Sequence, residues 1–108
     1  MRILFIHQNF PAQYLHLAAA LVARGDEVVA IGGPTARTLP NVPLHRYSLC
    51  PSADIPLCHP WASDFQTKIL RAEAVCATLE RLLASGFRPN LVVGHPGWGE
   101  LLGVKDLL

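Results

Sequence analysis

The sequence predicts an α/β protein built on a parallel, doubly wound sheet that is cut short. Short apolar or β-branched runs at residues 3–6, 27–31 and 91–93 have the character of buried strands. Stretches with apolar residues at three- and four-residue spacing separate them and indicate helices. Of the 108 residues, 51% are hydrophobic and 16% are charged, as expected for a sheet covered on both faces. This length allows one domain at most.

The start of the chain predicts a β-α-β unit. Residues 3–6 form the first strand, and Pro11 suits the first turn of a helix because its missing N–H would be unpaired there. Asn9 is a candidate cap for this helix, which should end near Arg24. The second strand follows at residues 27–31. Because such units are right-handed in nearly all cases, we expect the two strands to be parallel.

The middle of the chain is less regular. Five prolines interrupt residues 35–60, where only 44–49 has the pattern of a third strand. An apolar stripe at helical spacing then predicts the longest helix over residues 61–85. A buried strand is expected at 91–93, and a last short helix near Trp98.

Parallel sheets bind ligands at the carboxyl ends of their strands. If the strands at 3–6 and 91–93 are neighbours, the loops 7–11 and 95–100 should lie near each other. Loop 7–11 lacks the glycine-rich phosphate fingerprint, and glycines stand where a ribose-binding acid would close the second strand, which argues against a dinucleotide dehydrogenase. Taken alone, this loop is also compatible with simple helix capping.

Composition and charge exclude several classes of function. The net charge is +1 and no stretch concentrates Lys and Arg, so we expect no nucleic-acid partner. The first apolar run ends at His7, too early for a signal peptide or a membrane span, which predicts a cytoplasmic protein. The odd number of cysteines favours reduced thiols. Cys50, Cys58 and His59 have zinc-ligand chemistry but no fourth ligand at a recognised interval, so we expect no metal and no cofactor.

Two sequence blocks are more specific. The first is MRILFIHQNFP at residues 1–11, with Leu17-Ala18, Leu21, Arg24-Gly25 and EVVA at 27–30 behind it. The second is RPNLVVGHPGWGE at residues 88–100, followed by Lys105-Asp106. In this order the two blocks frame the chain, and together they resemble the N-terminal domain of family-four glycosyltransferases.

The resemblance implies a two-domain GT-B enzyme that transfers a sugar from a nucleotide-sugar donor with retention of configuration. Residues 1–108 would be a partial, acceptor-side N-terminal domain with a Rossmann-like sheet. The donor would bind mainly to a C-terminal domain that is absent here and carries the family's paired glutamates, so this chain alone is not expected to catalyse transfer. A sugar or lipid-linked acceptor is implied, which leaves open a peripheral location at the inner face of the membrane.

The resemblance also implies site residues. His95 matches a histidine that faces the transferred sugar and is the candidate catalytic residue, although a histidine satisfied within its loop is the alternative. The candidate substrate-binding residues are His7, Gln8, Asn9, Phe10, Gly97, Trp98 and Glu100. Core packing is an equal alternative for Trp98, and a carboxylate favoured by a helix dipole is the alternative for Glu100. Ala12 departs from the glycine of many relatives and makes close approach to the donor phosphates less certain.

A second class of function stays open. The short length and apolar composition also fit a small, non-catalytic α/β binding or interaction module. If the strand at 91–93 is left as an edge, its unpaired backbone could join two copies of the chain into a homodimer.

Overall fold

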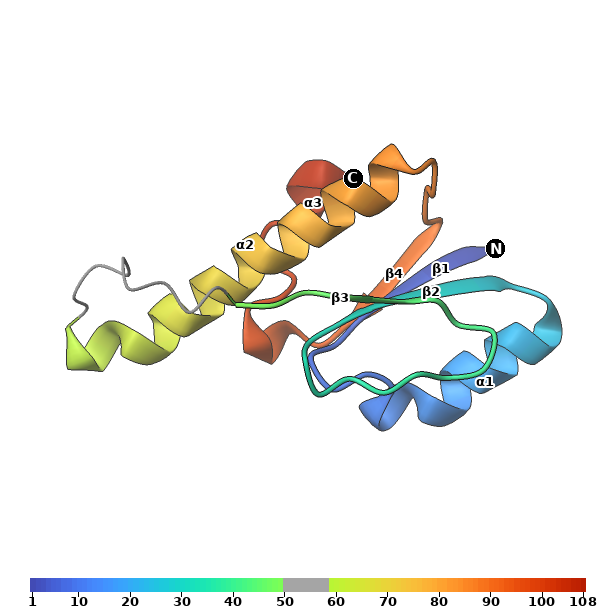
Figure 1. Ribbon diagram of the computed structural model, residues 1–108, viewed down its shortest axis with the longest axis horizontal. Helices are drawn as coiled ribbons and strands as arrows, with labels where there is room; N and C mark the ends of the chain where they lie inside the picture. The colour runs from blue at the N-terminus through green and yellow to red at the C-terminus, as the bar shows by residue number, and fades with distance from the viewer. Residues whose placement is uncertain (50–58) are drawn as a thin grey trace.

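A computed structural model describes residues 1–49 and 59–108 (Figure 1). Within them, one sheet contains four parallel strands, namely β1 (Arg2–Ile6), β2 (Glu27–Gly32), β3 (Leu44–Arg46) and β4 (Leu91–Gly94). The strand order is β3-β2-β1-β4. The chain therefore builds the sheet outward from β1 on one side and then returns to add β4 on the other. Strand order reverses between β1 and β4, the place where open α/β sheets bind ligands.

Helices cover both faces of the sheet. The helix α1 (Leu15–Arg24) lies on one face, while α2 (Ser63–Ala84) and the short α3 (Val104–Leu107) lie on the other (Figure 1). Single 3-10 turns precede or join them: η1 (Ala12–Tyr14), η2 (Pro60–Ala62) and η3 (Pro96–Trp98). The predicted α/β class and the predicted β-α-β unit are confirmed.

Alternate residues of the central strand β1 pack into two separate hydrophobic clusters, one on each face of the sheet. Ile3 and Phe5 pack with Ala18 of α1, whereas Leu4 and Ile6 pack in a cluster with Val75 of α2. These four side chains, at residues 3–6 of β1, are completely buried. Successive side chains of a strand point to opposite faces, so a sheet covered on both sides needs a continuous apolar run. This explains the ILFI sequence at residues 3–6.

The start of α1, the role of Asn9 and the end of β3 differ from prediction. The α-helix α1 begins at Leu15 rather than near Pro11, because the 3-10 turn η1 comes first. Asn9 does not cap this helix: its side-chain oxygen accepts a hydrogen bond from the Thr35 hydroxyl, and neither η1 nor α1 has a side-chain cap. The capping interpretation of Asn9 is therefore wrong. The short β3 also stops at Arg46, earlier than the 44–49 run predicts.

The apolar stripe along the longest helix, α2, is only partly buried. With 22 residues, α2 spans about 33 Å, whereas the six residues of β2 span about 20 Å. The N-terminal half of α2 therefore extends beyond the sheet (Figure 1). Phe65 and Ile69, which belong to this stripe, are 63% and 40% exposed for this reason.

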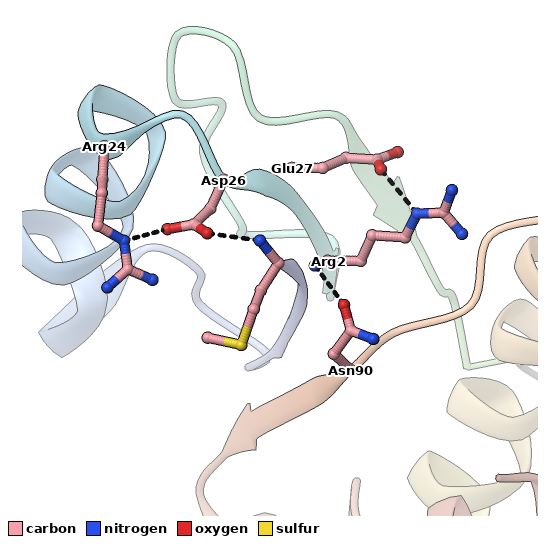
Figure 2. Close-up of polar contacts among 6 residues, drawn as sticks. Arg2, Arg24, Asp26, Glu27 and Asn90 are labelled. Atoms are coloured by element: carbon pink, nitrogen blue, oxygen red, sulfur yellow. Dashed lines mark hydrogen bonds and ion pairs between the residues drawn. The ribbon is translucent and has the colours of Figure 1, made fainter.

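Polar contacts link neighbouring strands of the sheet at their amino ends (Figure 2). The terminal ammonium of Met1 and the guanidinium of Arg24 both contact Asp26, at 2.7 and 2.6 Å. Next to them, Arg2 pairs with Glu27 through its side chain, and its backbone N–H donates to the side-chain oxygen of Asn90. These contacts join β1 to the starts of β2 and β4, at the edge opposite the carboxyl ends.

Candidate functional site

The structure brings the two predicted loops together. Ile6 of β1 is paired with Gly94 of β4, so His7 and His95 follow neighbouring positions of adjacent strands. The backbone N–H of Gln8 donates to Oε1 of Glu100 at 3.0 Å, which joins the loop after β1 to the loop after β4. The predicted juxtaposition of residues 7–11 and 95–100 is confirmed.

His95 is exposed, and its own loop fixes its tautomer. The imidazole caps η3, where Nδ1 accepts the backbone N–H of Gly97 at 3.0 Å. A neutral imidazole that accepts at Nδ1 carries its proton on Nε2. A Cβ on Gly97 would lie 2.8 Å from the His95 ring, so glycine is what allows this close approach. His95 therefore presents an N–H donor at the ring nitrogen opposite its cap.

The loop that carries His95 is held against α2. Nη1 of Arg71 donates to the carbonyl of Trp98 at 2.7 Å. Gly99 has φ of +87°, and a Cβ there would overlap the backbone of Lys68. Only glycine combines this backbone conformation with such close packing. Trp98 is 41% exposed, and its ring centroid lies 6.2 Å from that of His95. The partly exposed Trp98 side chain therefore lies beside the exposed imidazole.

His7 is buried, unlike His95. Its Nδ1 accepts the backbone N–H of Asn9 at 3.0 Å, and Tyr14 packs edgewise against its ring with centroids 5.8 Å apart. Burial, followed by the nearby His95, lowers the pKa of His7 from its usual 6.5. His7 is therefore neutral around pH 7, and its proton, like that of neutral His95, lies on Nε2.

Glu100 is completely buried and links three strand ends. Besides the Gln8 N–H on Oε1, its Oε2 accepts the hydroxyl of Tyr47 at 3.0 Å. Gln8 follows β1, Tyr47 follows β3 and Glu100 follows β4. The helix-dipole interpretation of Glu100 is wrong, since α3 begins only at Val104. Substrate contact by Glu100 stays a prediction, which its burial does not favour.

Burial has the largest effect on the pKa values of Glu100 and Tyr47. It raises the pKa of Glu100, and the hydrogen bonds from Tyr47 and Gln8 with the charge of Arg71 only partly oppose it. Burial, together with the adjacent Glu100, also raises the pKa of Tyr47, so its hydroxyl keeps its proton and donates. The sequence interpretation included neither Tyr47 nor Arg71.

The remaining predicted residues differ in accessibility. Gln8 is half-buried, and Asn9 and Gly97 are exposed. Phe10 is completely buried, with its ring centroid 6.0 Å from that of Phe5, so a substrate contact by its side chain stays a prediction that this packing does not favour. Beside Asn9, a hollow of about 420 Å³ is lined by Asn9, Pro11, Ala12, Leu15, Thr35 and Arg37.

Two other sequence interpretations concern metals and membranes. Cys50 and Cys58 of the zinc hypothesis lie outside the described residues. Over residues 1–49 and 59–108, the structure has no group of three or more His, Cys, Asp or Glu side chains arranged to hold a metal ion. In the same part of the chain, no helix combines the length and apolarity needed to cross a membrane.

Fold and site together define a class. A parallel α/β sheet with helices on both faces and polar loops at the reversal of strand order is a Rossmann-like domain. Residues 24–108 match the family model described as "Glycosyl transferase family 4 group", and the chain belongs to this family as an N-terminal domain. The match includes the second motif block and confirms the resemblance. No curated protein matches the chain.

Proposed function

We propose that this chain is the acceptor side of a GT-B glycosyltransferase that transfers a sugar from a nucleotide-sugar donor with retention. Family membership makes a glycosyltransferase-related role the starting point. The observation that supports the finer proposal is His95: an exposed imidazole with a fixed Nε2 donor, at the point where strand order reverses.

In this proposal, His95 acts on the transferred sugar. The neutral Nε2–H donates to a hydroxyl of that sugar, and a protonated ring helps to stabilise the negative charge of the departing diphosphate. The partly exposed side chain of Trp98 stacks on the apolar C–H groups of a sugar ring. Gln8 and Asn9 line the cleft from the neighbouring strand end, while the nucleotide is held mainly by a second, C-terminal domain.

Glu100 acts indirectly. Its two oxygens are already bonded to Gln8 and Tyr47, so its role in the proposal is to set the distance between the two loops. His7 has a similar position: it is buried, neutral and bonded to Asn9, and it fixes the start of the loop that meets Glu100.

The non-catalytic alternative has one observation in its favour. In the described sheet, β4 is an edge strand, and edges invite pairing with a second copy. Light scattering tests it: a monomer over a wide concentration range removes this alternative, whereas a concentration-dependent dimer supports it.

The test of the proposed function is kinetic and needs the enzyme that contains both domains. His95→Ala should lower kcat by about 100-fold, the effect of removing one donor that acts on developing charge, with a smaller change in donor affinity. His95→Gln should retain part of the activity because an amide can accept from Gly97 and still donate. His45→Ala, at an exposed position of β3, is the matched control. Unchanged turnover in His95→Ala would refute the assignment.

A further inference from the structure

A small cavity lies at the carboxyl ends of three strands. Its volume is about 200 Å³, and its walls come from the segments after β1, β2 and β3 and from α2. The lining residues are Gln8, Gly33, Pro34, Thr35, Tyr47, Ser48, Leu49 and Arg71. Pockets for whole ligands usually measure about 300–1,000 Å³, so this one suits a single chemical group rather than an entire substrate.

Arg71 is the charged residue of this cavity, and its position is fixed. The carbonyl of Trp98 takes one of its five N–H donors, at 2.7 Å. The charge of Arg71 and a side-chain hydrogen bond from it lower the pKa of Tyr47, and its charge also lowers the pKa of Glu100, in both cases against the larger effect of burial. The guanidinium thus reaches from the middle of α2 to the strand ends and retains donors for a ligand.

The other polar groups of the cavity are uncharged. The described lining residues include no acid, and Thr35, Tyr47 and Ser48 each bring a hydroxyl. The carboxylate of Glu100 contacts the lining residues Gln8 and Tyr47, but it is completely buried and both its oxygens already accept hydrogen bonds from the protein. The hydroxyls of Tyr47 and Thr35 already donate to Glu100 and Asn9, so a ligand group would meet the Arg71 cation and the Ser48 hydroxyl, with no acid among the described lining residues.

A second arginine supports the wall formed by residues 33–36. Nη1 of Arg46 donates to the carbonyls of Gly33, Pro34 and Ala36, at 3.3, 3.4 and 2.5 Å. These bonds hold the segment that contributes Gly33 and Thr35 to the cavity. They also occupy carbonyl oxygens that would otherwise repel an anion, and they add positive charge behind the wall.

From this arrangement, we propose that the Arg71 cavity binds an anionic group, a phosphate monoester or a carboxylate, of the acceptor substrate. Guanidinium recognises both groups through paired N–H donors. Since Arg71 is bonded to the carbonyl of Trp98, an acceptor anchored there has the rest of its structure close to Trp98 and His95. The assignment to the acceptor rests on the proposed function; the anion site itself does not.

The test is binding of small anions to the chain. Backbone amide NMR shifts are followed during titration with inorganic phosphate and, separately, with acetate. We expect saturable shifts at Gln8, Thr35 and Ser48. Arg71→Gln should weaken binding at least about tenfold, the effect of losing one charged hydrogen-bond pair. A response to phosphate alone assigns a phosphate ester, and a response to acetate alone assigns a carboxylate.

Two further variants keep the test decisive. Ser48→Asp places a negative charge in the cavity and leaves the bond between Arg71 and Trp98 intact, so it should abolish binding even if Arg71→Gln does not fold. Arg81→Gln, on the same helix but bonded to Thr78, should bind like the wild type. Absence of saturable shifts, or equal weakening in Arg81→Gln, would overturn the anion site. Anion binding that persists in an enzyme without sugar transfer would instead overturn only the proposed function.

Discussion

The buried bond between Tyr47 and Glu100 offers a quantitative test of how the site is held together. Tyr47 follows the edge strand β3, and Glu100 follows β4 at the other edge of the sheet. The hydroxyl and the carboxylate are 3.0 Å apart and buried, and the second carboxylate oxygen accepts the N–H of Gln8. If this link positions the loops, its two ends should be energetically coupled.

The magnitudes follow from the number of bonds lost. Tyr47→Phe removes one hydrogen bond to a carboxylate and should cost about 2 kcal/mol. Glu100→Ala removes both bonds and leaves a buried hydroxyl and a buried N–H unpaired, which should cost about 4 kcal/mol. Once Glu100 is gone, the Tyr47 hydroxyl has less to lose, so the double variant should cost about 1.5 kcal/mol less than the sum of the single variants.

Urea unfolding at pH 7, followed by far-UV circular dichroism, measures these differences. Domains of this size are stable by only about 5–15 kcal/mol, so Glu100→Ala leaves a narrow margin. Glu100→Gln should remain folded more readily, because its amide oxygen accepts from Gln8 and its amide N–H donates to the Tyr47 oxygen. We expect this variant to lose about 1 kcal/mol of unfolding free energy. Strictly additive losses for Tyr47→Phe and Glu100→Ala would refute a direct link.

Two other predictions concern His7 and Gly99. Burial lowers the pKa of His7 below its unfolded value of 6.5, so the folded state binds fewer protons and stability is lost as the pH falls from about 6.5 to the lower pKa of the folded state. His7→Gln should lose less stability than the wild type between pH 7.5 and 5, and parallel urea midpoints would contradict this. Gly99→Ala should cost about 2–3 kcal/mol, because left-handed strain adds to an overlap with Lys68. Gly86→Ala, with φ of +97° but open space, isolates the strain alone; equal losses in the two variants would show that the packing on α2 contributes nothing.

The sequence predicted the fold where local patterns and tertiary packing agree. The ILFI run of β1 is buried on both faces, and the β-α-β unit and the long helix α2 lie where their periodicity indicates. The site loops also meet as expected, because the carboxyl ends of parallel neighbours share one edge. These predictions depend on short-range patterns and on a general property of parallel sheets.

The differences between the sequence patterns and the structure have specific physical causes. Asn9 has the residue type of a cap, but a tertiary partner, Thr35, takes its side chain. Phe65 and Ile69 continue an apolar stripe that the sheet is too short to cover. Glu100 was expected at a helix start, yet a turn intervenes and its carboxylate turns into the core instead. In each case, the sequence pattern carried no information about what lies opposite the side chain.

Tyr47 and Arg71 were not among the predicted site residues, although the sequence contains a signal for each. Tyr47 lies in the proline-interrupted region, where strand signals were weak, but it follows the third strand and so belongs to the ligand edge. Arg71 lies on the same side of α2 as the buried residues Val75 and Thr78, four and seven positions away. A charged residue on a buried helix face needs a partner, which here comes from the Trp98 carbonyl and the buried carboxylate.

The two ends of the sheet use polar groups in different ways, and this difference supports a ligand site at the carboxyl edge. At the amino edge, Asp26 is engaged by both Arg24 and the terminal ammonium, so these charges are satisfied within the protein. At the carboxyl edge, Nδ1 of His95 is occupied by its own loop, but the proton-bearing Nε2 is opposite that bond, and Arg71 donates to the Trp98 carbonyl and to Tyr47 and has further N–H groups among its five donors. Groups that are fixed on one side and unsatisfied on the other are what preorganised binding requires, since their orientation costs little when a ligand arrives.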